Sequence, residues 1–183
     1  MKAVATDNCS TQTTTVAIIS DTHTVLDSRI AEAISHADIA IHAGDIGDAS
    51  VLSTMRPKTG RVVAVSGNND HPIFWPVDQT EILESMPEIA RLELPGGSVA
   101  IEHGHRHNSN SPNHQSLRNA HPDARLVVYG HTHHQVIDDG STPWVVNPGA
   151  AGAIRTHGGP SYLLLTASHQ HWQIESFRFT DDC

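Results

Sequence analysis

The first 70 residues of the chain alternate short apolar runs with segments of helical periodicity. Residues 16–19, 39–43 and 61–65 are almost continuously apolar and rich in β-branched side chains, which is typical of strands buried on both faces. Between them, hydrophobic positions recur at helical spacing over about 27–36 and 48–55. An order of strand, helix, strand, helix, strand predicts right-handed crossovers and a parallel sheet.

The second half of the chain is rich in strands and turns. Two apolar stretches flank Pro95-Gly96-Gly97 and two more flank residues 138–140, so both pairs are expected to form hairpins. The strands expected here cover 89–94, 98–101, 125–129, 135–137, 144–146, 161–166 and 170–179, with short helices over about 80–85 and 114–120. This arrangement predicts a second sheet packed on the first.

The length of the chain and its N-terminal composition bear on domain organisation. Residues 1–15 are mostly Thr, Ser, Ala, Asp and Asn without periodicity, which predicts a flexible arm. Residues 16–183 are expected to form a single domain, because a chain of 183 residues is long enough for one sizeable core.

Composition and charge exclude several classes of protein. The hydrophobic share is 38%, and no apolar run is long enough to cross a membrane. The N-terminus lacks a basic region followed by an apolar core, so a cytoplasmic protein without a secretory signal is expected. The net charge of −9 disfavours binding to nucleic acid or to an anionic membrane. A phosphate substrate stays compatible with it, because bound divalent cations reverse the local field.

Metal-capable side chains follow five of the strand-like runs. They are Asp21 and His23, Asp45, Asn68, His103, and His131 with His133. Ligands of parallel sheets bind beyond the carboxyl ends of the strands, where these side chains are expected to meet. Carboxylate, amide and imidazole groups suit Mn, Fe, Co, Ni or Zn. The cysteines of the chain, Cys9 and Cys183, have no metal-binding spacing.

Taken singly, each of these signals has an ordinary explanation. A Gly-Asp pair is usually a turn, and His103 alone is more often a polar loop residue than a ligand. The segment Gly130-His131-Thr132-His133 is a stronger signal, but it also fits a mononuclear zinc site. A zinc hydrolase of the metallo-β-lactamase type is excluded, because Gln135 stands where that class needs Asp. The specificity lies in the order of all five signals.

That order resembles the calcineurin-like metallophosphoesterase superfamily. The motifs that carry the resemblance are Asp21-x-His23, Gly44-Asp45, Gly67-Asn68-Asn69-Asp70, His103-Gly104-His105 and Gly130-His131-Thr132-His133. The short chain, the His-Gly-His motif and Asn147-Pro148-Gly149-Ala150 are similar to the small YfcE/Vps29-like branch. The resemblance covers about residues 16–166.

The resemblance implies an α/β fold, a four-layer αββα sandwich of two mixed sheets, with two metals at one edge. Asp21, His23 and His133 would hold the first metal. Asn68, His103 and His131 would hold the second metal. Asp45 would bridge them, and a hydroxide shared by the metals would attack phosphorus in line. The implied cofactors are two divalent transition metal ions, manganese first, with Fe, Ni, Co or Zn as alternatives.

One position departs from the family pattern. The family usually has histidine after the asparagine ligand, where it contacts substrate or protonates the leaving group, and here the residue is Asn69. An amide can donate to a phosphoryl oxygen but cannot act as a general acid near neutral pH. Asp70 then has no histidine to orient, and a structural cap is an equal alternative. His105, Arg106 and Arg155 are further candidates for contact with phosphate, with a solvated loop as the alternative for the first two. Phe74 and Trp75 are candidates for a wall of the cleft, with ordinary packing as the alternative.

The expected function is that of a metal-dependent phosphoesterase, more narrowly a phosphodiesterase acting on a small phosphate ester. Asp45, Asn68, Asn69, His103 and His105 are the expected catalytic residues. Neither specific nucleic-acid binding nor membrane binding is expected, and a homo-oligomer is compatible with the sequence. The alternative is a Vps29-like scaffold for protein interactions that retains the metal site. Scaffold members commonly lose metal ligands, whereas all seven positions are filled here.

Overall fold

The computed structural model describes residues 13–108 and 111–180. Its first sheet has five strands in the order β10-β9-β1-β2-β3. They are β1 (Thr14–Ile19), β2 (Ile39–His42), β3 (Arg61–Ala64), β9 (Ser161–Ala167) and β10 (Trp172–Arg178). β1, β2 and β3 are parallel, as the sequence predicts. β9 and β10 are antiparallel to their neighbours, so the sheet is mixed.

The second sheet also has five strands, in the order β4-β5-β6-β8-β7. They are β4 (Ile89–Leu94), β5 (Gly97–Glu102), β6 (Leu126–Val128), β7 (Gln135–Asp138) and β8 (Trp144–Pro148). β5, β6 and β8 are parallel, and β4 and β7 are antiparallel strands at the two edges. Both predicted hairpins are present, as β4–β5 and β7–β8.

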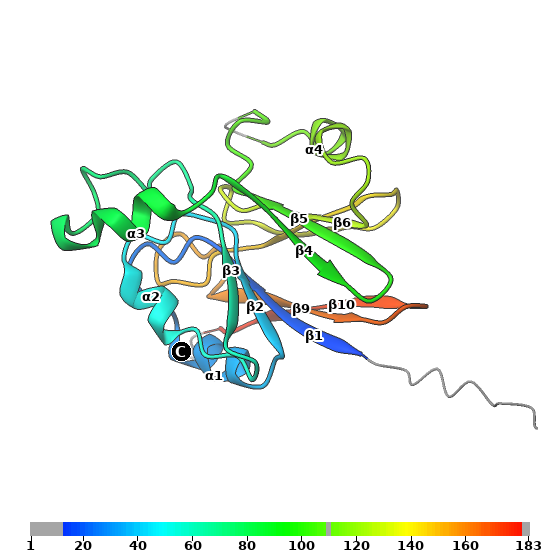
Figure 1. Ribbon diagram of the computed structural model, residues 1–183, viewed down its shortest axis with the longest axis horizontal. Helices are drawn as coiled ribbons and strands as arrows, with labels where there is room; N and C mark the ends of the chain where they lie inside the picture. The colour runs from blue at the N-terminus through cyan, green and yellow to red at the C-terminus, as the bar shows by residue number, and fades with distance from the viewer. Residues whose placement is uncertain (1–12, 109–110, 181–183) are drawn as a thin grey trace, which may run out of the picture.

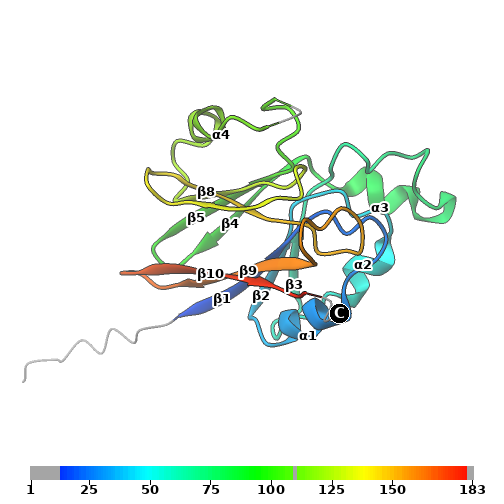
Figure 2. The same ribbon diagram turned by 180° about the vertical axis from the view of Figure 1, so that it is seen from behind.

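The two sheets pack face to face, with helices on both outer sides (Figure 1). α1 (Ser28–Ser35) covers the first sheet and α4 (His114–Ala120) covers the second, which Figure 2 shows from behind. α2 (Ala49–Thr54), the 3-10 turn η1 (Val77–Gln79) and α3 (Thr80–Ser85) lie at one side. The predicted four-layer αββα sandwich is therefore confirmed.

β1 shows why its sequence is continuously apolar. Val16 and Ile18 belong to the core between the two sheets, together with Leu126 of β6. Ala17 and Ile19 belong to the cluster beneath α1. All four β1 side chains are fully buried, and complete burial of a Val or Ile contributes about 1.5–3 kcal/mol. Both faces of the strand are therefore in the core, as the pattern predicts.

Most element boundaries differ from the sequence prediction by one or two residues, and two of the differences have a clear cause in the structure. β1 begins at Thr14, because Thr14 and Thr15 pair with the end of β9, so residues 14 and 15 are not part of the predicted arm. Residues 1–12 lie outside the described part of the chain. β10 begins at Trp172 rather than at residue 170, because three hydrogen bonds between Ser168 and His171 close a turn there. Within the described residues, no helix is long and apolar enough to span a membrane.

Candidate metal centre

Five of the predicted metal ligands have a left-handed backbone. The φ angles are 54° for Asp21, 45° for His23, 56° for Asp45, 70° for His131 and 59° for His133. A residue with a Cβ is strained in this region by about 1–2 kcal/mol, and such residues concentrate at functional sites. The loops that follow β1, β2 and β6 are therefore held in unfavourable conformations where the predicted ligands lie.

Asp21, His23 and His133 form the first group of ligand atoms, which lie within 4.8 Å of one another. His23 Nε2 is 3.1 Å from His133 Nε2, and Asp21 Oδ1 is 3.3 Å from His133 Nε2. Asp21 Oδ1 is buried and has no hydrogen-bond partner among the described residues. A buried, unpartnered carboxylate oxygen is expensive unless a cation binds it, so this group fits a metal ion.

The ring of His133 is oriented from behind by a loop. Its Nδ1 lies 3.3 Å from the carbonyl oxygen of Ile154 and 3.2 Å from that of Arg155. An Nδ1–H donating to these carbonyls leaves the lone pair of Nε2 free toward Asp21 and His23. Metal-binding histidines are commonly fixed by this kind of contact.

The second group consists of Asp21, Asp45 and His103, again with ligand atoms within 4.8 Å of one another. His103 Nδ1 lies 2.8 Å from the carbonyl oxygen of Ala43, to which it can donate. Its Nε2 is 3.3 Å from Asp45 Oδ1, and it is buried without a hydrogen-bond partner in the described part of the chain. His103 therefore presents an open nitrogen to two carboxylates, as a metal ligand would.

The protonation of this second group reflects its charges. Burial alone would lower the pKa of His103, but contact with Asp45 and the charge of Asp21 outweigh it and raise the pKa to about 9. Burial raises the pKa of Asp45, yet His103 and the N–H groups of Asn69 hold it well below its usual range. The imidazole proton thus sits where a divalent cation would replace it.

Asp45 faces both groups. Its Oδ1 is 3.3 Å from His103 Nε2, and its Oδ2 is 3.9 Å from His23 Nε2. Asn69 fixes this carboxylate, because its backbone N–H donates to Oδ1 at 2.8 Å and its side-chain amide donates to Oδ2 at 2.6 Å. The sequence placed Asn69 at the phosphoryl group, whereas the structure turns its amide to Asp45.

The other predicted residues lie at different distances from the groups. The His131 backbone N–H donates to Asp21 Oδ2 at 3.0 Å, and its ring centroid is 5.2 Å from that of His103. The His105 ring lies 5.6 Å from that of His103, and its buried Nδ1 has no partner among the described residues. Asn68 is exposed after β3, and no hydrogen bond in the described structure joins its side chain to either group. The structure therefore places His131 and His105 beside the two groups, and the role of Asn68 as a ligand stays a prediction.

Asp70 acts as the structural cap that the sequence left as one alternative. Its carboxylate accepts hydrogen bonds from the backbone N–H groups of Ile46, Gly47 and Gly67. It also accepts one from Trp75 Nε1 at 3.0 Å. Asp70 thereby ties the loop that carries Asp45 to the loop that carries Asn69.

His42 is a buried residue beside the site that the sequence analysis missed. Its Nδ1 accepts from the Gly44 N–H, and its Nε2 lies 2.9 Å from Thr22 Oγ1, which in turn donates to the Ile46 carbonyl. Burial lowers the pKa of His42 to about 4, so the ring is neutral at physiological pH. The one signal in the sequence is a histidine inside the apolar run 39–43.

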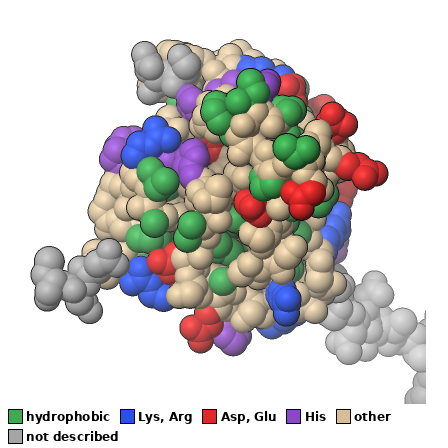
Figure 3. Space-filling view, turned by 90° about the vertical axis from the view of Figure 1, so that its left-hand side faces the viewer, with side chains coloured by type: hydrophobic (Ala, Val, Ile, Leu, Met, Phe, Trp, Pro, Cys, Tyr) green, Lys and Arg blue, Asp and Glu red, His purple; other side chains and the backbone are tan. Residues whose placement is uncertain are grey.

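A cleft of about 260 Å³ opens beside Asp45. It is lined by His23, Thr24, Asp45, Gly47, Asn69, Phe74 and Arg155. Histidine, basic and hydrophobic side chains gather on the face of the molecule that Figure 3 shows. The cleft therefore joins the two ligand groups to an aromatic and a cationic side chain.

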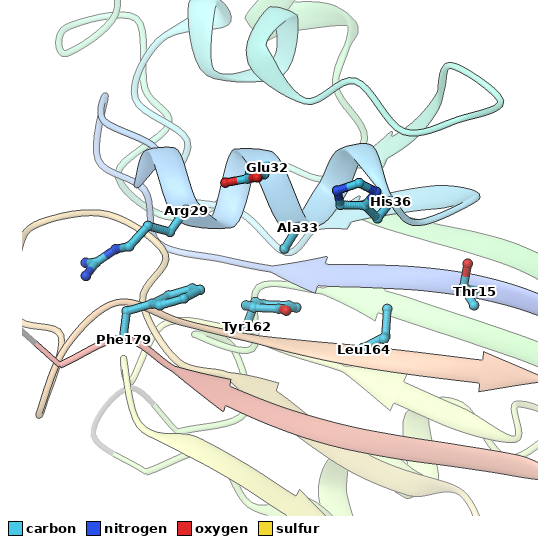
Figure 4. Close-up of a pocket in the computed structure, with 8 residues that line it drawn as sticks. All are labelled: Thr15, Arg29, Glu32, Ala33, His36, Tyr162, Leu164 and Phe179. Carbon is cyan, nitrogen blue, oxygen red and sulfur yellow. The ribbon is translucent and has the colours of Figure 1, made fainter.

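A larger groove, of about 430 Å³, lies elsewhere, between α1 and the outer face of β9 (Figure 4). Its floor is formed by Tyr162, Leu164 and Phe179, and α1 contributes one wall. None of its described lining residues is a predicted metal ligand. The candidate metal centre is therefore marked by the convergence of predicted ligands and not by the size of its cleft.

Comparison with known proteins gives a family match. Residues 15–170 match the family model for the calcineurin-like phosphoesterase superfamily domain. A probable metallophosphoesterase of Methanocaldococcus jannaschii is 29% identical over 140 residues, which cover 74% of this chain and 67% of that protein. A phosphodiesterase of the same organism is 29% identical over 170 residues, covering 86% of this chain and 96% of that protein.

Solved structures show the same fold. A single mutant of Vps29 from Entamoeba histolytica superposes with a TM-score of 0.70 at 16% identity, covering 91% of this chain and 99% of that one. YfcE, a phosphoesterase from E. coli, superposes with a TM-score of 0.58 at 21% identity, covering 90% of this chain and 98% of that one. Identities this low support the shared fold and leave activity to the site itself.

Proposed function

We propose that this chain, which belongs to the calcineurin-like phosphoesterase superfamily, is a metal-dependent phosphodiesterase that hydrolyses small phosphate esters. The observation that carries the proposal is the meeting of two ligand groups at Asp21, where Asp21 Oδ1 and His103 Nε2 are buried without a partner among the described residues. Burial removes these atoms from water, and bound cations would compensate for the lost hydration.

In this proposal two metal positions share the site. Asp21, His23 and His133 would hold one divalent ion, and His103 and His131 would hold the other, with Asn68 turning inward to join them. Asp45 would bridge the two positions, which its contacts with His103 and His23 support. Divalent ions bound there would neutralise the phosphate oxygens and lower the pKa of the attacking water. Manganese is the first candidate among the transition metals.

The protein's own side chains would hold the metal ligands in position and would not transfer protons. Asn69 would fix the Asp45 carboxylate through its two hydrogen bonds. His103 and His133 would be held in one tautomer by the carbonyl oxygens behind them. Burial lowers the pKa of His105, so its ring is mostly unprotonated at neutral pH and does not supply a proton to the leaving group. Hydrolysis transfers a water oxygen to phosphorus and releases an alkoxide, so solvent would protonate that leaving group.

The lack of a built-in acid bears on the substrate. An amide occupies the position where the family usually has histidine; one of its N–H groups donates to Asp45, and an amide cannot act as a general acid near neutral pH. We therefore expect good leaving groups, such as aryl oxides, to be cleaved much faster than simple alkoxides. A small substrate, a cytoplasmic location and the absence of specific nucleic-acid or membrane binding remain part of the proposal.

The test is hydrolysis of bis(p-nitrophenyl) phosphate by the full-length chain supplied with Mn²⁺. We expect turnover with the wild type and its loss in Asp45→Asn, which keeps the size of the side chain and removes its charge. No turnover with any of Mn²⁺, Ni²⁺, Co²⁺ or Zn²⁺ would count strongly against the proposal.

The second candidate is a Vps29-like protein-interaction scaffold that retains the metal site. It is favoured by the fold likeness to Vps29 and by the apolar groove between α1 and β9 (Figure 4). The seven metal-capable side chains disfavour it, since a scaffold needs none of them. Metal bound without turnover of phosphomonoesters, phosphodiesters or cyclic nucleotides would favour the scaffold.

A further inference from the structure

We propose that Phe74 and Arg155 form a specificity subsite for a nucleotide, with the base against Phe74 and an anionic phosphate oxygen at Arg155. The inference rests on the proposed phosphoesterase function and names its substrate class. Both side chains line the cleft of about 260 Å³ that also exposes Asp45, His23 and Asn69. An aromatic ring and a cation therefore lie beside the groups that would hold the metals.

The Phe74 side chain is exposed, and its neighbour Trp75 packs the segment against the core in its place. Its relative exposure is 67%, although burying a phenylalanine would contribute about 1.5–3 kcal/mol. The next residue, Trp75, is only 3% exposed, packs in a core cluster and donates to Asp70. Trp75 therefore anchors the segment, and the Phe74 ring stays available at the rim of the cleft.

The backbone of Phe74 holds this ring in place. Its N–H donates to the His71 carbonyl at 2.8 Å, and the His71 ring meets the Phe74 ring edge-on at 6.4 Å. Aromatic side chains presented in this way stack nucleobases, and each stacked base contributes about 1–3 kcal/mol by alanine substitution. Phe74 also lines the cleft, and its side chain is largely exposed there.

Arg155 supplies a positive charge at the cleft. Its side chain is exposed, and no carboxylate in the described part of the chain pairs with its guanidinium. Its φ of 52° is strained, and its carbonyl oxygen lies 3.2 Å from His133 Nδ1. The strained backbone thus places one residue against a predicted metal ligand and directs its cation to the cleft.

The two side chains together select a chemical class. An arginine forms strong charge-assisted hydrogen bonds with phosphate oxygens but gives no preference for what the phosphate carries. Phe74 adds that preference, because an aromatic face favours a planar base over a bare sugar. A nucleotide carries both a phosphate and a planar base, so it is the ligand class that this pair of side chains fits.

The test compares AMP with ribose 5-phosphate, two ligands that differ only by the base. Binding is measured by calorimetry on the full-length chain supplied with Mn²⁺. The wild type should bind AMP about tenfold more tightly than ribose 5-phosphate, which corresponds to about 1.4 kcal/mol. Phe74→Leu should remove this difference and leave ribose 5-phosphate unchanged. Arg155→Gln should weaken both ligands by a similar factor.

The matched control is Ile73→Ala, because Ile73 is 80% exposed on the same segment and does not line the cleft. This variant should bind both ligands like the wild type. The subsite is refuted if the wild type binds the two ligands equally or not at all, or if Phe74→Leu weakens both. Base preference without turnover of bis(p-nitrophenyl) phosphate would refute the esterase alone, and turnover without base preference would refute the subsite alone.

Discussion

His23 Nε2 and His133 Nε2 lie 3.1 Å apart, although 110 positions separate the two residues in the chain. Their rings stack with centroids 5.0 Å apart and planes inclined by 28°. Each is carried by a loop whose backbone is left-handed at the histidine itself. In the proposed metal centre, these two imidazole nitrogens and the Asp21 carboxylate would hold one cation between them.

The first prediction concerns Gly67, which gives the Asp45 carboxylate its space. A Cβ at Gly67 would lie 2.2 Å from Asp45 Oδ1 and 2.4 Å from the Asp45 backbone nitrogen, so the carboxylate would have to move. We expect Gly67→Ala to weaken Mn²⁺ binding by about 10–100-fold, the usual effect of disturbing a ligand's support. Titration of the metal-free protein with Mn²⁺ measures this effect.

Gly140→Ala is the control for Gly67→Ala, because a Cβ at Gly140 would meet nothing within 4 Å. It should bind Mn²⁺ like the wild type. Circular dichroism of both variants without metal verifies that each is folded. Wild-type affinity in folded Gly67→Ala would show that the position of Asp45 does not matter for metal binding.

The second prediction concerns proton release on metal binding. The pKa of His103 is about 9 without metal, so at about pH 7.5 its ring carries a proton that a cation at Nε2 must displace. We expect Mn²⁺ binding to release close to one proton from His103 at that pH, with affinity that rises as the pH approaches 9. Above that pH the release should fade.

Calorimetric titrations in two buffers of different ionisation enthalpy give the number of protons released. The control is His103→Gln, which should lack this proton and bind Mn²⁺ more weakly. Binding of Mn²⁺ by the wild type with no proton release near pH 7.5 would mean that His103 is not a ligand.

The third prediction concerns acid stability and His42. Burial lowers the pKa of His42 to about 4 from an ordinary value of 6.5, so the unfolded chain takes up this proton first as the pH falls. The His42 contribution should be fully present above pH 6.5, decline between pH 6.5 and 4, and level off below. At about 1.4 kcal/mol for each pKa unit, the decline amounts to about 3 kcal/mol.

Urea unfolding of the metal-free protein across this pH range measures the decline. His42→Gln should be less stable but should lack this part of the pH dependence. His169→Gln, at an exposed histidine in the turn before β10, should keep the wild-type profile. Identical pH profiles of the wild type and His42→Gln would contradict the role given to the buried ring.

Local sequence patterns predicted most elements of the fold, because a strand or helix with a buried face has hydrophobic residues at a characteristic spacing. α3 and α4 begin and end where the pattern placed them. The order of the second sheet was not predictable in this way. From the sequence, either strand of the β7–β8 hairpin could pair with β6. Packing in the folded protein decides that β8 pairs with it.

The sequence predicted which strand ends form the candidate site, but it did not predict how the side chains there are oriented. Asp21, Asp45 and His103 meet because the carboxyl ends of β1, β2 and β5 lie together. The direction of Asn69 depends on the turn after β3, whose geometry no residue spacing encodes, and there its amide reaches Asp45. For the same reason the sequence placed Asn68 among the ligands, while its side chain is exposed in the structure.

The most direct test of the account is the metal content of the full-length chain. The chain is saturated with Mn²⁺, freed of unbound ions and measured by elemental mass spectrometry against its protein concentration. The account predicts two ions per wild-type chain and fewer in folded Asp45→Asn. A folded wild-type chain that retains no Mn²⁺, Fe²⁺, Co²⁺, Ni²⁺ or Zn²⁺ would contradict it.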